Sequence, residues 1–178
     1  MIEKGDIILK EVDISNIDSW YKWLNDPEIT KYQDKGKFPN TKEKQYNYIT
    51  KMQNSNNNVL FAITYKKTGF TIGSVSLQDI DWINRSAKLG IMIGKKSFIG
   101  KGIGKIVWNM ITKHGLFELN LHRIYADCFE ENKASLKCAL ASGFKVEGTI
   151  RDKYYKNGKW HNAIILSVLK DEFKEVKS

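Results

Sequence analysis

Three glycines within five residues, at positions 100, 102 and 104, constrain this chain more than any other feature of its sequence. An apolar alternating run at 89–93, which predicts a strand, and a short basic loop precede them. The stretch that follows, up to residue 117, has apolar side chains at helical spacing. A glycine loop at a helix start predicts an anion site, because the first turn has unpaired N–H groups and a dipole that favours negative charge. We therefore expect a phosphorylated cofactor there.

The spacing of the glycines excludes two common nucleotide-binding motifs. The run lacks the Gly-Lys-Ser/Thr ending of a nucleoside-triphosphate loop, and it does not read G-x-G-x-x-G. It also lies in mid-chain, whereas a dinucleotide-binding fold normally opens with such a loop. Lysines at 95, 96, 101 and 105 would add positive charge for a phosphate. For this stretch alone, a glycine-rich turn without a ligand is the alternative.

The composition predicts one globular domain that spans residues 1–178. Hydrophobic residues make up 42% of the chain and charged residues 28%, which suits a folded core rather than a disordered segment. The net charge of +9 favours anionic partners such as phosphates, nucleotides, nucleic acid or an acidic protein. Cys128 and Cys138 lack metal-ligand neighbours, so we interpret both as reduced thiols and predict no metal site.

The same survey predicts a cytoplasmic protein without a membrane partner. No apolar run is long enough to span a bilayer, and no signal-type segment precedes the first predicted strand. We find no linker and no internal repeat.

Periodicity and turn signals predict the element order β-α-α-β-β-β-α-β-α-β-β, an α/β arrangement with a mixed sheet and helices on its faces. A ligand should bind where the central strands part. The expected strands are 7–11, 59–65, 70–77, 87–93, 122–129 and two long strands around an Asn-Gly turn at 157–158. The expected helices run from Asp13 or Ser15 to Asn25, from Thr41 to Gln53, from the glycine loop to about 117, and from Asn132 to Ser142.

Four stretches, which together cover nearly the whole chain, resemble the GNAT acetyltransferase superfamily. WLNDPEITKY at 23–32 is similar to the W-x-N-D-P-E-V segment of the branch that includes the ribosomal-protein N-terminal acetyltransferases. FIGKGIGK at 98–105 is similar to the acyl-CoA pyrophosphate loop, R/Q-x-x-G-x-G/A. ENKASLKCALASGF at 131–144 is similar to the N-x-x-S…G-F block, and EGTIRDKYYKNGKW at 147–160 to the E-G…R…N-G tail. Their order and separation make the resemblance specific.

The resemblance implies a GNAT fold: an α/β (α+β) domain with a mixed central β-sheet of about seven strands, helices on both faces, and strands splayed at the acyl-CoA site. It implies an N-acetyltransferase that moves the acetyl group of acetyl-CoA, its co-substrate, directly to a primary amine. The residues that it assigns to the cofactor are Met92, Ile93, Ile99, Gly100, Lys101, Gly102, Ile103, Gly104, Lys105, Asn132 and Ser135.

Departures from the family's pattern leave the catalytic acid and base open. Many members carry a glutamate, discussed as a general base, where this chain has Lys88, and a tyrosine that protonates the thiolate where it has Ala139. Ser135 lies one helical turn after Asn132, and we propose that it stabilises the thiolate instead; a local helix-start hydrogen bond is the alternative. The candidates for the base are Asp79, Asp81, Glu130, Glu131 or a bound water, while His114, His122 and His161 are expected to be structural or surface residues.

The acceptor pocket of this fold is expected between the first two helices, the loop that joins them and the last hairpin. We predict an amine acceptor that is an amino sugar, a nucleotide-linked amino sugar or a protein N-terminus, because a net charge of +9 fits a polyamine poorly. A homodimer is compatible with the sequence, and nucleic acid is not the expected partner. The alternative function is a basic, catalytically weak module that binds CoA, RNA or the ribosome. The predicted acceptor-binding residues are Trp23, Asn25, Glu28, Trp82, Arg151 and Tyr155.

Overall fold

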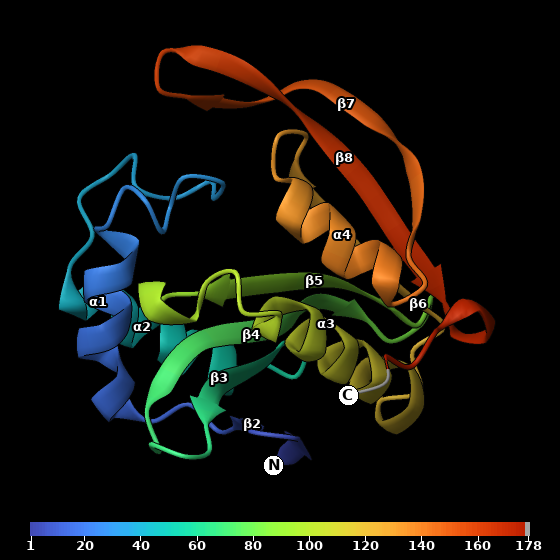
Figure 1. Cartoon of the computed structure of the whole chain (residues 1–178), viewed down its shortest axis with the longest axis horizontal. Helices are drawn as coiled ribbons and strands as arrows, with labels where there is room; N and C mark the ends of the chain where they lie inside the picture. Colours follow the sequence, from blue (N-terminus) through green and yellow to red (C-terminus); the bar gives the residue numbers. More distant parts are fainter. Residues whose placement is uncertain (177–178) are drawn as a thin grey trace.

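One eight-stranded β-sheet organises the computed structural model, which describes residues 1–176 (Figure 1). Its strand order is β1-β2-β3-β4-β5-β6-β8-β7, and every neighbouring pair is antiparallel except β5 with β6. The strands are β1 (Ile2–Lys4), β2 (Ile7–Lys10), β3 (Val59–Tyr65), β4 (Thr71–Asp81), β5 (Ser86–Ile93), β6 (Arg123–Phe129), β7 (Lys145–Lys156) and β8 (Lys159–Leu169).

Four α-helices accompany the sheet within the described residues. They are α1 (Ile17–Leu24), α2 (Lys42–Gln53), α3 (Ile103–Lys113) and α4 (Lys133–Ala141). Short helical turns add η1 (Ile14–Asn16), η2 (Lys96–Phe98), η3 (His114–Glu118, a π-turn that extends α3) and η4 (Lys170–Glu172). No helix in residues 1–176 is both long and apolar enough to cross a membrane.

Local sequence signals explain most of these boundaries. Asp13 caps η1 by accepting a hydrogen bond from the Ser15 amide, and Thr41 caps α2 through the Lys44 amide. Asn157 and Gly158 both have positive φ, at 52° and 77°, which is the geometry that a two-residue hairpin turn requires. These predicted starts and turns are therefore confirmed.

Helices cover both faces of the sheet, as the side-chain alternation of the strands shows. In β3, Ile63 belongs to the larger core that packs under α3, whereas the adjacent Ala62 belongs to a second core with Trp20 of α1. In β5, Leu89 likewise belongs to the larger core and Met92 to the second core. The predicted mixed α/β sheet with helices on both faces is thus confirmed.

The structure differs from the prediction in two details of the sheet. An eighth strand, β1, pairs with β2 through a turn at Gly5, and its three residues are too few to show a periodic pattern. Strand β4 continues to Asp81 instead of ending at residue 77. The register shifts between Gln78 and Asp81, where Asp79 has a φ of 51°, and this irregularity breaks the alternation that a sequence pattern would need.

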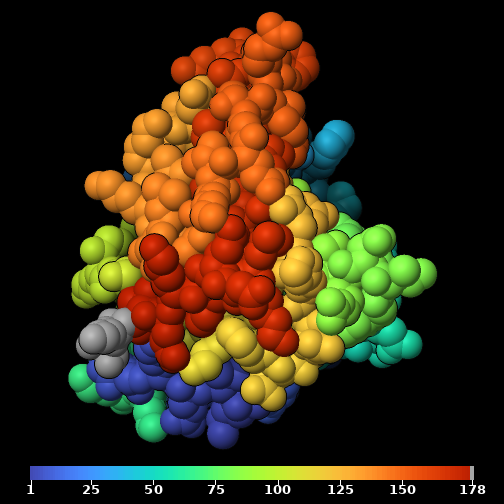
Figure 2. All heavy atoms as spheres, turned by 90° about the vertical axis from the view of Figure 1, so that its right-hand side faces the viewer, coloured from blue at the N-terminus to red at the C-terminus, as the bar shows by residue number. Residues whose placement is uncertain are grey.

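The central feature of the sheet is the parting of β5 and β6. Their parallel pairing covers only three residues of each strand, from Ser86 with Arg123 to Lys88 with Tyr125. Strand β5 then continues to Ile93 along β4, while β6 continues to Phe129 along β8. The β7–β8 hairpin extends from this second half of the sheet, and Figure 2 shows it rising above the body of the molecule. The two halves of the sheet therefore enclose a wedge-shaped gap.

Candidate active site

The glycine loop lies beside the wide end of the gap, before the first turn of α3. Gly100 and Gly102 have φ angles of 77° and 76°, and a Cβ on either would meet no atom within 4 Å, so the space before this backbone is open. Gly102 is the residue that caps α3, and its carbonyl accepts from the Lys105 and Ile106 amides. The earlier amides of the turn point outward and can hold an anion, which fits the pyrophosphate of an acyl-CoA.

Backbone amides of β5 line one edge of the gap. The Gly94 amide donates to the Ile72 carbonyl of β4 at 2.9 Å, so alternation turns the amides of Ile91 and Ile93 away from β4, into the gap. The Ile91 carbonyl faces the same way, because Gln33 Nε2 donates to it at 3.4 Å. The Met92 amide points toward β4 instead. Of the two predicted strand residues, only Ile93 can therefore offer its N–H group to a ligand in the gap.

The start of α4 lies on the β6 side, and Asn132 and Ser135 come together there as predicted. Asn132 Oδ1 accepts from the Ser135 amide at 3.2 Å, so this side chain caps the helix. The cap uses only the oxygen, and the Nδ2 group can still donate to a ligand. Burial, followed by the charge of Asp127, raises the pKa of the Cys128 thiol on β6, and the neighbouring Ser135 side chain opposes this rise.

Lys88, which stands where many family members have a glutamate, forms an ion pair across the vertex of the gap. Its ammonium lies 2.5 Å from Asp127 of β6, whose side chain is only 3% exposed. Lys153 pairs with the same carboxylate at 2.6 Å, and the Tyr154 hydroxyl donates to it. Burial raises the pKa of Asp127, but the hydrogen bonds from Lys153, Lys88 and Tyr154 outweigh it and hold that pKa at about 2. Asp127 is therefore ionised and a weak base at neutral pH.

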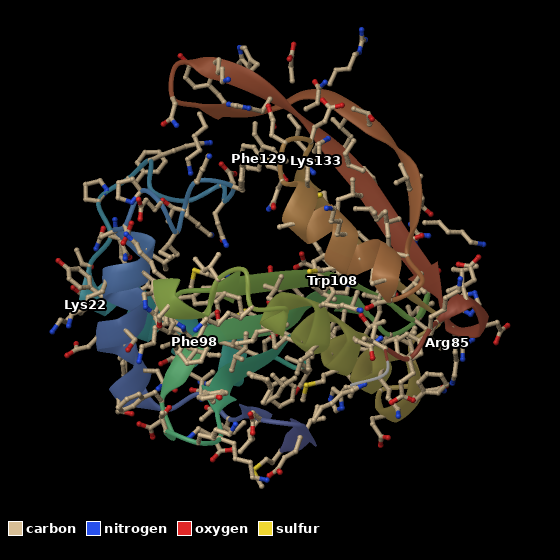
Figure 3. All side chains as sticks on the ribbon, viewed as in Figure 1. Lys22, Arg85, Phe98, Trp108, Phe129 and Lys133 are labelled. Atoms are coloured by element: carbon tan, nitrogen blue, oxygen red, sulfur yellow. The ribbon has the colours of Figure 1, made fainter. Side chains whose placement is uncertain are left out.

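The aromatic residues around this cluster connect β6 to the hairpin. Phe129 stacks on Tyr154 with ring centroids 4.2 Å apart and an interplanar angle of 10°, and it also contacts Tyr32 at 6.1 Å. Figure 3 shows Phe129 at the end of β6 near Lys133, the first residue of α4. Burial, followed by the hydrogen bond to Asp127, raises the pKa of Tyr154, so its hydroxyl stays protonated. Ala139 is fully buried in the core and offers no polar group.

A cavity of about 540 Å³ opens on the side of the sheet that faces α1 and α2. Its floor includes Ser76 and Gln78 of β4, which bond to each other at 2.7 Å, and Gly90 of β5. Its wall includes Trp20 and Asn40, each with a buried side-chain N–H group that has no partner in the described residues. The full lining is Trp20, Leu24, Gln33, Asp34, Lys35, Gly36, Lys37, Phe38, Pro39, Asn40, Lys44, Gln45, Tyr48, Leu60, Ser74, Ser76, Gln78, Gly90, Ile91 and Met92.

The charges in this cavity are mainly positive. Asp34 is the single carboxylate of the lining, and it pairs with Lys37 at 2.5 Å. Lys35 and Lys44 complete the charged lining. Burial raises the pKa of Tyr48, so its hydroxyl is a neutral donor and acceptor at physiological pH. The lining is therefore rich in hydroxyl, carboxamide and ammonium groups.

The predicted acceptor residues fall into two groups. Trp23, Asn25 and Glu28 lie at or just after the end of α1. A Cβ on Gly94 would lie 2.0 Å from the Trp23 ring, Asn25 Nδ2 donates to a carbonyl of α1, and Glu28 pairs with Lys96. Trp82 lies in a separate hollow at the β4–β5 turn, and Arg151 and Tyr155 are exposed on β7. None of these six residues lines the cavity within the described chain.

Of the four carboxylates predicted as candidates for the base, three accept hydrogen bonds elsewhere, and Asp79 lies in the separate hollow with Trp82. Asp81 accepts from the Ile83 and Asn84 amides in the β4–β5 turn, Glu130 accepts from Asn162, and Glu131 from His161. Sequence reasoning missed Asp127, because its position in the alternating pattern of β6 predicts only which face of the sheet it occupies. It also missed Ser76 and Gln78 of β4. These two polar residues are two positions apart and therefore lie on the same face of the strand, a pattern that the sequence does show.

Comparison with known proteins agrees with this geometry. A family model described as an acetyltransferase (GNAT) domain matches residues 6–145. An uncharacterized N-acetyltransferase, p20, of Bacillus licheniformis is 27% identical over 94% of each chain. A putative ribosomal N-acetyltransferase of Bacillus subtilis is 34% identical over 61% of this chain and 59% of its own length.

Spermidine acetyltransferases are also among the relatives. The spermidine N(1)-acetyltransferase of Escherichia coli K12 is 28% identical over 59% of this chain and 56% of its own length. The crystal structure of a Vibrio cholerae spermidine N-acetyltransferase with CoA and spermine has the same fold, with a TM-score of 0.88 over 95% of this chain and 98% of that one, at 22% identity.

These matches favour the enzyme over the alternative of a binding module without turnover. Acetyl-CoA is the co-substrate of this family. The chain therefore belongs to the GNAT acetyltransferase family and is an acetyl-CoA-dependent N-acetyltransferase.

Proposed function

We propose that the acceptor is the primary amine of a polyhydroxylated small molecule: an amino sugar, either free or linked to a nucleotide. The observation that carries the proposal is the lining of the cavity beside the gap. Its hydroxyl and carboxamide groups suit sugar hydroxyls, its aromatic side chains suit a flat ring, and its lysines suit phosphates. The single carboxylate is already paired with a lysine.

The same lining argues against a polyamine, although relatives of this chain acetylate spermidine. A polycation would place its ammonium groups among Lys35, Lys37 and Lys44, with Asp34 as the only carboxylate in the lining to balance them. Like charges at close range disfavour binding. In addition, removing water from an ammonium group that has no counter-charge costs roughly several kcal/mol in a partly closed site.

A protein N-terminus is the second candidate. The 34% identity to a putative ribosomal N-acetyltransferase favours it, and the neutral hydrogen-bonding groups of the cavity could also bind a peptide backbone. The two candidates share the reactive group, a primary amine, and differ in what surrounds it.

For the cofactor, we propose that the loop backbone from Ile99 to Lys105 holds the pyrophosphate. The Ile93 amide and the Asn132 side chain would bond the amide arm. Transfer joins the amine nitrogen to the acetyl carbon and breaks the thioester C–S bond. One proton must leave the amine and one must reach the sulfur. We assign Ser135 to the sulfur, since it lies one helical turn after Asn132 at the start of α4 and its backbone amide bonds the Asn132 side chain.

Replacing Gly102 by alanine tests the cofactor loop. The Cβ would strain a residue with a φ of 76° and would project into the open space before the loop, so acetyl-CoA affinity should fall by at least about tenfold, ~1.4 kcal/mol. Gly69→Ala is the matched control, because Gly69 has a φ of 69° and equally open surroundings in the β3–β4 turn. Calorimetric titration should show normal binding for the control, and equal loss in both variants would contradict the assignment.

Replacing Ser135 by alanine tests the thiolate contact. The variant should lower kcat by about tenfold, the loss expected for a charge-assisted hydrogen bond of ~1.5–3 kcal/mol. The Asn132 cap uses the Ser135 backbone amide, so the helix should survive. Unchanged kcat, measured by thiol release at saturating substrates, would return Ser135 to a local structural role.

The pH dependence of kcat/KM tests whether Asp127, Tyr48 or Tyr154 acts as a general base. Asp127 has a pKa of about 2, and burial raises the pKa values of Tyr48 and Tyr154, so none of the three accepts a proton near neutrality. We expect log kcat/KM to rise with pH and to level off at the pKa of the acceptor amine. When two acceptors whose amines differ in pKa are compared, the inflection should move by the difference between the two amine pKa values. An inflection near pH 6–7 that both acceptors share would instead reveal an enzyme base.

An acetylation screen read by mass spectrometry tests the acceptor class. The panel contains UDP-glucosamine, glucosamine, spermidine and short peptides with free N-termini, each with acetyl-CoA. We expect the highest kcat/KM for the sugar amines, and for UDP-glucosamine above glucosamine if the cavity lysines bind phosphate. Efficient turnover of spermidine with both sugars inert would overturn the proposal, and turnover of peptides alone would establish the second candidate.

A further inference from the structure

Lys156 joins two segments that lie far apart in the sequence. It is the last residue of β7, directly before the Asn157-Gly158 turn, and its ammonium points into the loop between α1 and α2. It donates hydrogen bonds to three backbone carbonyls of that loop: Gln33 at 2.7 Å, Lys35 at 3.1 Å, and Thr30. Figure 1 shows the tip of the hairpin approaching the same loop.

The segment that Lys156 holds is a wall of the cavity. Residues 33–40 of the loop line the cavity without interruption, and two of the three carbonyls belong to this run. At its other end the loop is tied by Asp26, which pairs with Lys96 of η2 at 2.9 Å. The α1–α2 loop is therefore attached to the body at Asp26 and to the hairpin through Lys156.

The chemistry of the contact suits a lysine. An ammonium has three donors and no acceptor, so it can satisfy three converging carbonyls at once, which a planar guanidinium cannot match. The side chain is half-buried; burial, and then the charge of Lys37, lower the pKa of Lys156. Asp34 of the same loop raises that pKa. Bonds to a charged donor are stronger than neutral ones.

We propose that Lys156 is a positioning residue for the acceptor: it holds the α1–α2 loop in place as the cavity wall and thereby sets the affinity for the amine substrate. The inference rests on the proposed function only in placing the acceptor in this cavity. The hairpin thus acts on the acceptor through one ammonium group rather than through Arg151 or Tyr155, which are exposed on its surface.

Hydrogen–deuterium exchange of Lys156→Met tests the contact without any acceptor. Methionine keeps the length and apolar stem of lysine but removes its donors. Exchange of the loop amides should speed up by about tenfold or more, including the Thr30 amide bonded to Asp26 and the Gln33 amide bonded to Thr30. The control is Lys159→Met, which changes the exposed residue that pairs with Lys156 across the turn. It should leave the loop unchanged.

Steady-state kinetics with UDP-glucosamine tests the consequence. Lys156→Met should raise the KM for the amine by about tenfold, while the acetyl-CoA dissociation constant and the saturated kcat stay within about twofold of the parent. Lys156→Arg should recover only part of the affinity. Lys159→Met should behave as the parent.

The outcomes separate this inference from the proposed function. If the amides of the α1–α2 loop exchange at the same rate in Lys156→Met as in the parent, the inference is overturned, whichever amine is the substrate. Faster exchange with an unchanged KM would overturn the positioning role, because the loop would then be irrelevant to the acceptor. If the parent enzyme turns over neither UDP-glucosamine nor glucosamine, the acceptor proposal fails. The KM comparison is then made with the amine that the screen identifies.

Discussion

The site depends on the early end of the pairing between β5 and β6. Two strands that stop pairing leave backbone N–H and C=O groups without partners, and such groups need hydrogen bonds from elsewhere. Here the free edge of β5 faces the gap, and Gln33 donates to one of its carbonyls, that of Ile91. The glycine loop, the cap of α4 and the cavity are all arranged around that edge.

The ion pair at the vertex of the gap replaces backbone pairing where that pairing ends. Lys88 belongs to the last paired position of β5, and Asp127 lies two residues beyond its partner on β6. A buried carboxylate between two ammonium groups favours one separation of the strands, because its charge would be uncompensated in any other. Lys88, at the position where many family members carry a glutamate, thus links the two strands through its ion pair with Asp127.

Sequence reasoning succeeded where the signal is local and failed where it depends on distant segments. Caps such as Asp13 and Thr41, the Asn157-Gly158 turn and the glycine loop could be predicted, because each is determined by residues within one or two turns. The contact between Lys88 and Asp127 could not, since the two residues are brought together only by the order of strands. The same limit applies to the end of β4, which lies four residues beyond its predicted position and places Trp82 in the hollow at the β4–β5 turn.

The net charge of the chain was a useful but incomplete guide to the acceptor. Several lysines are paired with surface carboxylates, as in Lys42 with Asp18 and Lys66 with Glu3, and contribute little to any site. What matters is the balance within the cavity, where three lysines face one carboxylate. The charge of the whole chain and the charge of the cavity have the same sign here, but only the second can discriminate between amines.

The contact of Lys156 with the α1–α2 loop has a consequence for how such an enzyme could change over generations. The three groups that it binds are backbone carbonyls, which every residue type provides. Substitutions at positions 33–35 can therefore alter the side chains that face the cavity while the loop keeps its attachment. Selection for a new amine would then act on the loop residues one at a time, without first rebuilding the scaffold that presents them.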